Sequence, residues 1–171
     1  MVYPIVKYGE SVLENQAETV MEFDTPELNK LLDDMFASMY AAKGVGLAAP
    51  QIGVGRRIAV IDTSVGEDPT AKIVLINPEI IKVEGRQTSE EGCLSLPGFR
   101  EQVTRGHKVT IRAQNAKGET FEMTGEDLLA RAFLHETDHL NGTLYITHVS
   151  PLKRDLIRRK VRKMQKAGEW G

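Results

Sequence analysis

The chain has 171 residues, 41% hydrophobic and 27% charged, with a formal net charge of −2, which is the profile of a soluble globular protein with a real core. No apolar run approaches the ~20 residues of a membrane span, and the first residues show no signal peptide. A single cysteine excludes an internal disulfide, so we expect one domain in a reducing cytoplasm with no membrane partner.

The first predicted elements are a helix and a glycine-rich segment. Thr25 and Pro26 are typical of a helix start, as N-cap and first helical residue. Apolar residues then recur at helical spacing until Gly44 ends the helix: Leu28, Leu31, Leu32, Met35 and Met39. Residues 44–55 are rich in Gly and Ala, so we expect a loop or a short irregular strand there.

The middle of the chain has the composition of strands. β-branched residues and alternation predict strands over five stretches: 57–62, 73–76, 80–84, 108–114 and 120–124. We expect Asn77-Pro78 to interrupt the strand structure between the second and the third of these stretches. Asn115 to Gly118 has the residues of a hairpin turn between the last two.

Two further helices are predicted toward the C-terminus. Thr124 to Asp127 resembles a capping box that opens an apolar helix over 128–140, and Asn141-Gly142 closes it. Ser150-Pro151 opens the last helix, which runs to about Lys166. Strands in the middle and helices toward the ends indicate one α+β domain.

The sequence His135-Glu136-Thr137-Asp138-His139 matches H-E-x-x-H within the predicted helix 128–140. Residues four apart lie on one helix face, roughly 6 Å apart, so the two imidazoles can bind one metal ion. Glu136 between them can then transfer protons. The alternative is a pair of hydrogen-bonded core histidines, since the pattern fixes only three positions.

A catalytic metal site usually has three protein ligands and one open position. Cys93 is a candidate for the third ligand, because a thiolate binds zinc or iron(II) strongly. The alternative is that Cys93 is a small buried hydrophobe. His107 looks like an exposed turn residue, and His148 lies beside the cap of the last helix, so we assign neither to the metal.

Three motifs together are more specific than any one: Gly44 to Gln51 (GVGLAAPQ), Glu91 to Ser95 (EGCLS) and His135 to His139 (HETDH). In this order and separation they resemble the peptide deformylase family, which shows G-φ-G-φ-A-A-x-Q, E-G-C-L-S and Q-H-E-x-D-H. The resemblance extends over essentially the whole chain. It departs at Leu134, where the family usually has Gln, on a different helix face from the ligands.

The resemblance implies a fold and a reaction. The fold is a single compact α+β domain over residues 1–171, with antiparallel-rich sheets around a central metal-binding helix and a C-terminal helix. The reaction is the metal-dependent hydrolysis that removes the N-formyl group from the formyl-methionine of nascent polypeptides and releases formate. A metal held by Cys93, His135 and His139 would lower the pKa of its bound water toward ~7, and the resulting hydroxide would attack the formyl carbonyl.

The same resemblance implies roles for three further residues. Glu136 points about 100° around the helix from His135, which suits a general base that returns its proton to the leaving amine. The Gln51 amide and the backbone N–H of Leu94 would donate hydrogen bonds to the oxyanion. Without the resemblance, Gln51 could equally be an ordinary loop residue.

The family match also implies substrate contacts. The positions that match a methionine pocket or the substrate path are Val45, Gly46, Glu91, Arg100, Leu128, Arg131 and Ala132. Gly46 has no Cβ, so substrate backbone could approach it and pair as an added strand. Arg131 could instead belong to a solvated helix face. Glu91 is expected to pair with Arg105 and so hold the Cys93 loop in place.

The metal and the partners remain less defined. A Cys-His-His site accepts iron, zinc, nickel or cobalt; the family often works with Fe²⁺, and zinc could replace it on purification. Residues 151–166 hold eight Lys/Arg and one acid, against 14 basic and 23 acidic residues in the rest of the chain. The resemblance implies that this helix docks on the ribosome. The sequence pattern of the helix alone also fits a solvated helix that packs on the body of the protein through one apolar stripe: Leu152, Leu156, Ile157 and Val161.

Two other functions use the same residues. A zinc protease or aminopeptidase would cut a peptide bond with H-E-x-x-H, but many such enzymes take the third ligand from downstream of the motif. A ribosome-associated factor without catalysis is the second, although binding a metal needs neither Glu136 nor Gln51. We therefore predict a monomeric peptide deformylase that acts on N-formyl-Met peptides in the cytoplasm.

Overall fold

The computed structural model describes residues 1–170. Its elements in chain order are α1 (Ser11–Glu14), α2 (Pro26–Ala41), β1 (Gly46–Ala48), η1 (Ala49–Ile52), β2 (Ile58–Ile61), η2 (Pro69–Ala71), β3 (Ile73–Glu84), β4 (Gln87–Gly92), β5 (Arg100–Arg105), β6 (Lys108–Gln114), β7 (Thr120–Glu126), α3 (Asp127–Leu140), η3 (Tyr145–His148) and α4 (Pro151–Lys166). In these 170 residues no helix combines the length and the apolar character that a bilayer crossing requires.

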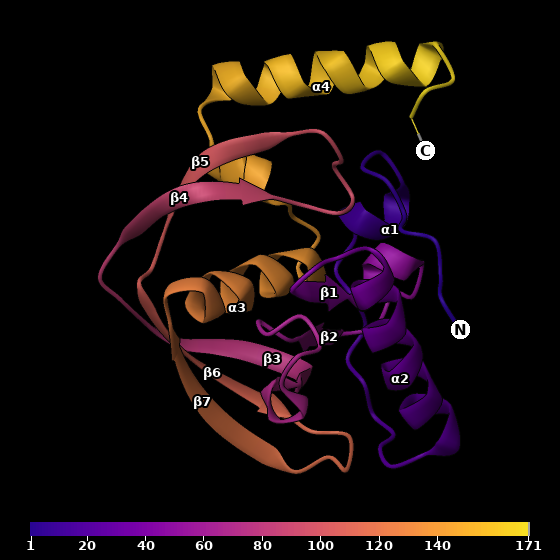
Figure 1. Ribbon diagram of the computed structural model, residues 1–171, viewed down its shortest axis with the longest axis vertical. Coiled ribbons are helices and arrows are strands. Elements are labelled where there is room, and N and C mark those ends of the chain that lie inside the picture. The colour runs from indigo at the N-terminus through magenta and orange to yellow at the C-terminus, as the bar shows by residue number, and fades with distance from the viewer. Residues whose placement is uncertain (171) are drawn as a thin grey trace.

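The strands form two antiparallel sheets. One has five strands in the order β1-β2-β3-β6-β7, and β4 pairs with β5 in a separate ribbon. Figure 1 shows α3 between the five-stranded sheet and the β4–β5 ribbon, with α4 on the far side of the ribbon. The expected α+β architecture, with antiparallel sheets around a central helix and a helix at the C-terminus, is confirmed.

Helix α3 is held in place by its apolar face. Ala130, Phe133 and Leu140 are buried against Val109 and Ile111 of β6. Burying a large apolar side chain stabilises a fold by about 1.5–3 kcal/mol, so this face fixes the rotation of the helix about its axis. The opposite face, which carries the two histidines, is thereby turned toward the β4–β5 ribbon.

The predicted break at Asn77-Pro78 is wrong, because β3 runs through it. Asn77 adopts a left-handed conformation with φ of 51°, and the register against β6 shifts between Ile76 and Glu79. The Asn77 side chain accepts from the backbone N–H of Val20 at 2.8 Å and donates to its carbonyl at 2.9 Å. The irregularity is therefore a bulge that anchors a distant segment rather than the end of a strand.

Two strands, β4 and β5, are present although the sequence does not predict them. Two other expectations need correction. The capping box is wrong: Thr124 lies in β7 with its hydroxyl 2.8 Å from that of Thr110, and Glu126 precedes the helix without a side-chain cap. On α4 only Ile157 and Val161 of the apolar stripe are buried; two leucines are exposed: Leu152 and Leu156.

Candidate metal centre

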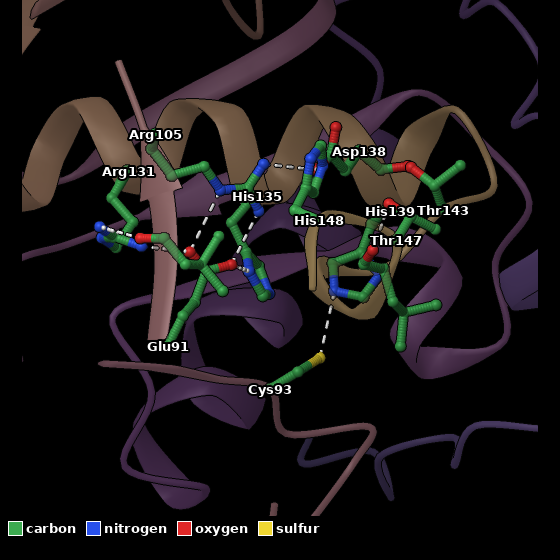
Figure 2. A network of polar contacts seen from close by, with 12 residues as sticks. Glu91, Cys93, Arg105, Arg131, His135, Asp138, His139, Thr143, Thr147 and His148 are labelled. Carbon is green, nitrogen blue, oxygen red and sulfur yellow. Dashed lines mark hydrogen bonds and ion pairs between the residues drawn. The ribbon is translucent and has the colours of Figure 1, made fainter. Parts of the chain in front are cut away.

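Two elements bring together one cysteine and two histidines. His135 and His139 lie one turn apart on α3 with their ring centroids 4.9 Å apart. Cys93 follows the last residue of β4, and its Sγ lies 3.3 Å from His139 Nε2 (Figure 2). One ligand atom from each residue falls within 4.8 Å of the others, so the three sites are close enough to share one ion.

The chemistry of this cluster fits a metal. Two imidazole nitrogens and a thiolate are ligands that zinc and iron(II) accept, and three protein ligands leave a position open. His139 is fully buried, yet its Nδ1 has no hydrogen-bond partner among residues 1–170, and neither has Glu136 Oε1. A pair of satisfied core histidines does not account for these buried unpaired atoms.

A buried carboxylate orients the first histidine. Glu91 Oε2 lies 2.7 Å from His135 Nδ1, which leaves Nε2 of that ring directed at the ligand cluster (Figure 2). Arg105 donates to both oxygens of Glu91, at 3.2 and 2.7 Å, and Arg131 donates to Oε1 at 2.6 Å. The expected pair between Glu91 and Arg105 is confirmed, and a metal-binding histidine oriented by a carboxylate is a common arrangement.

This ion network also assigns two residues whose place the sequence left open. Arg131 is 6% exposed and its Nη2 donates to the carbonyl of Val103 at 3.1 Å, so the solvated helix face is wrong for it. His148 Nε2 contacts Asp138 Oδ2 at 3.0 Å, and Asp138 in turn accepts from Arg105 at 2.8 Å. His148 therefore lies at the outer end of the network and outside the ligand cluster.

Burial and neighbouring groups shift the pKa values of Glu91, His139 and Glu136. Burial alone would raise the pKa of Glu91, but hydrogen bonds from His135 and Arg105 hold it well below its usual range. Burial lowers the pKa of His139, and the neighbouring His135 lowers it further, which favours the neutral ring that ligates metals. Burial raises the pKa of Glu136 to about 7.

Gln51 is held with its amide nitrogen toward the ligands. It lies in η1, directly after β1, and is 1% exposed, so it is not an ordinary loop residue. Its Oε1 accepts from the Ala48 backbone N–H at 3.0 Å. Its Nε2 consequently faces Ser95 Oγ at 3.2 Å and Cys93 Sγ at 3.6 Å. Sequence reasoning missed Ser95, although it is the last residue of the EGCLS motif.

A cavity of about 530 Å³ unites these side chains. Every residue proposed for the site from the sequence lines it, apart from the fully buried His139: Val45, Gly46, Gln51, Glu91, Cys93, Leu94, Arg100, Leu128, Arg131, Ala132, His135 and Glu136. Two apolar residues that the sequence did not indicate also line it, Leu96 and Phe99. The lining is thus mixed, because charged residues such as Arg131 and Glu136 lie in the same cavity as apolar ones such as Leu96 and Phe99.

Gly46 makes room for Glu136. A Cβ at Gly46 would lie 2.5 Å from Glu136 Oε2, which is closer than real contacts allow. Strand β1 therefore lies directly against the carboxylate, and it is the end strand of the five-stranded sheet. The carboxylate and a strand edge consequently meet in the same cavity.

Comparisons with known proteins agree with this geometry. The sequence model of the polypeptide deformylase family matches residues 2–155. A peptide deformylase of Acidobacterium capsulatum is 64% identical over 170 residues, covering 99% of each chain, and one of Thermodesulfovibrio yellowstonii is 49% identical over 93% of this chain and 96% of the other. The crystal structure of a peptide deformylase from Legionella pneumophila superposes with a TM-score of 0.89 at 45% identity over 98% of each chain.

Sequence and fold agree along nearly the full length of these relatives. The motifs, the central helix α3 and the Cys-His-His cluster all lie within the matched residues. The family is metal-dependent and removes the N-formyl group from the formyl-methionine of nascent polypeptides, so this chain is a hydrolase of that kind. The chain belongs to the peptide deformylase family.

Proposed function

We propose that six residues carry out the hydrolysis of the formamide bond in this chain. Cys93, His135 and His139 hold one divalent metal, Glu136 accepts a proton from water and passes it to the leaving amine, and Gln51 stabilises the oxyanion. The backbone N–H of Leu94 is the second oxyanion donor. When bound, the metal supplies Lewis-acid chemistry that makes water a nucleophile at neutral pH.

One observation carries this assignment. The buried Glu136 carboxylate and the Gln51 amide line the same cavity as two of the three ligands. Gln51 Nε2 donates one hydrogen bond to Ser95 Oγ at 3.2 Å, and its other hydrogen is directed toward Cys93 Sγ, which lies 3.6 Å from Nε2. A donor fixed in this way needs little reorganisation when negative charge develops beside the ligands.

We propose that the substrate enters as an extended strand along β1. Gly46 presents backbone without a side chain, and β1 has only β2 as a strand neighbour in residues 1–170. Three apolar residues that line the cavity are proposed to contact the methionine side chain: Val45, and Leu128 and Ala132 of α3. Arg100, which lies 3.4 Å from Glu90 and is exposed, is proposed to contact substrate backbone at the mouth.

The metal, compartment and assembly are further parts of the proposal. We propose Fe²⁺ as the metal in the cell; the same donors accept Zn²⁺, Ni²⁺ or Co²⁺ in a purified sample. All the proposed site residues come from one chain, which supports a monomer. The substrate, a newly made polypeptide, supports a place in the cytoplasm.

A formate-release assay tests the reaction. Protein prepared without oxygen is given formyl-Met-Ala-Ser or Met-Ala-Ser, formate and free amino acids are measured, and the metal in the same sample is determined. We expect formate from the first peptide only, with the chain left intact. Release of free methionine from Met-Ala-Ser would instead identify a peptidase and overturn the proposal.

We also propose that α4 contacts the ribosome. Four of its exposed basic residues that form no bond to the body of the protein within residues 1–170 are Arg159, Lys160, Arg162 and Lys163. Attraction of such residues to RNA phosphates depends on salt, because binding releases counterions. A basic helix near the peptide exit would also place the cavity close to emerging chains.

Replacing these four α4 residues by Ala should weaken ribosome binding by about tenfold or more at low salt and flatten its salt dependence. Hydrolysis of a short formyl peptide should not change, because none of the four lines the cavity. Binding is measured by co-sedimentation across a salt series, with Ala at the exposed Lys108 and Lys117 of the sheet as the control. Equal affinity of both variants would contradict this docking surface.

A further inference from the structure

Trp170 and the last turns of α4 lie against the segment that precedes α1. Trp170 Nε1 donates to the carbonyl of Tyr8 at 2.9 Å, and Arg158 Nε of α4 donates to the Tyr8 hydroxyl at 3.1 Å. At Gly9, where φ is +112°, a Cβ would lie 2.9 Å from Gln165 Nε2. Figure 1 shows this end of α4 beside α1, so two distant parts of the chain are closely joined here.

The same N-terminal segment bonds to both loops that hold the proposed oxyanion donors. The backbone N–H of Val6 donates to the carbonyl of Gln51 at 2.7 Å. The backbone N–H of Tyr8 donates to the carbonyl of Ser95, also at 2.7 Å. Because Ser95 Oγ also accepts from the Gln51 side chain at 3.2 Å, the segment fixes this amide through two routes.

We propose that Trp170 is a positioning residue for the oxyanion donors. By holding Tyr8 it fixes the N-terminal segment that ties Gln51 and Ser95 together, and with Ser95 the neighbouring backbone N–H of Leu94. Trp170 thereby helps to place both donors. This inference rests on the oxyanion role proposed for Gln51.

A second contact of Trp170 points to the same place. Its ring meets that of Phe99 edge to face, with centroids 6.2 Å apart and planes at 67°, and Phe99 lines the cavity. Aromatic pairs of this kind contribute beyond their buried area. Trp170 therefore contacts Phe99 of the cavity wall on one side and Tyr8 of the N-terminal segment on the other.

The simpler explanation is that Trp170 only anchors the terminus. The two can be separated, because oxyanion donors act at 2.7–3.1 Å and small displacements lower the rate of the chemical step. A positioning role therefore predicts a lower kcat with KM nearly unchanged. An anchoring role predicts a lower melting temperature alone.

A double-mutant cycle on the metal-loaded, full-length protein tests the inference. Trp170→Ala and Trp170→Phe are each made in the parent and in Gln51→Ala, and kcat and KM for formyl-Met-Ala-Ser are measured well below the melting temperature. We expect Trp170→Ala to lower kcat about three- to tenfold in the parent and clearly less in Gln51→Ala, where only the Leu94 donor is left to be displaced. Trp170→Phe keeps a ring against Phe99 but lacks the Nε1–H donor, so it should show most of the same loss.

The outcomes distinguish the two proposals. An equal loss of kcat in both backgrounds, or no loss in the parent, overturns the positioning role of Trp170. Full activity of Gln51→Ala by itself overturns the oxyanion role of Gln51, and the inference with it. Glu169→Ala, at the exposed residue that precedes Trp170, is the control and should leave kcat unchanged in both backgrounds.

Discussion

Glu136→Gln is expected to lower kcat by about 10²- to 10⁴-fold while the metal content per chain stays that of the parent protein. The amide cannot accept the proton that the carboxylate takes. Glu136 is not one of the three clustered ligands, so its replacement removes no metal donor. Gln has almost the same shape as Glu, so it fits the space beside Gly46 that the absence of a Cβ leaves for the Glu136 side chain.

This result is checked by measuring formate release and bound metal on the same preparation. Glu126→Gln is the matched control, because it makes the same chemical change at an exposed position beside the start of α3. It should have parental activity. An active Glu136→Gln enzyme would show that another group moves the proton, and loss of metal would show that Glu136 is itself a ligand.

Glu91→Gln should have the largest effect on stability. Glu91 is 5% exposed and accepts from two arginines and one histidine: Arg105, Arg131 and His135. Removing one partner of a buried ion pair leaves an uncompensated charge, which costs about 3–5 kcal/mol. Because the His135 ring also loses the carboxylate that orients it, we expect metal affinity to fall by about 10- to 100-fold.

Urea unfolding of the metal-free protein measures the first effect, and metal titration of folded protein measures the second. Glu90→Gln is the control: it is the preceding residue, is exposed, and pairs only loosely with Arg100 at 3.4 Å. It should change the free energy of unfolding by less than about 0.5 kcal/mol. A Glu91→Gln protein as stable as this control would show that the network contributes little.

The three long helices, α2, α3 and α4, could be predicted from the sequence because their signals are local. Thr25 accepts from the backbone N–H of Leu28, as its N-cap pattern predicted, and α4 has the predicted bounds Pro151–Lys166. Strands β4 and β5 could not, because Thr88, Ser89 and Glu90 are exposed and show no apolar alternation. Their pairing with each other holds them in place, together with the buried Val103 and the buried ion pair between Glu91 and Arg105.

The site was predictable in part for a similar reason. The spacing of His135 and His139 is a property of one helix, whereas Cys93 joins them only through the tertiary fold, and the family resemblance indicated it first. The partners of Arg131 could not be predicted, because Glu91 lies 40 residues away in the sequence. A buried arginine cannot be distinguished from an exposed one in the sequence until the carboxylate that it pairs with is known.

Strand β1 has a consequence for when the enzyme can act. It is a three-residue end strand, so a peptide that lines up along it must offer backbone N–H and C=O groups that nothing else has bonded. Residues already paired in a helix or sheet of the new protein cannot do so. If substrates bind along β1 as proposed, a protein can be deformylated only until its N-terminal residues fold, and a strand of three residues contacts so little of the substrate that chains of many sequences can bind there.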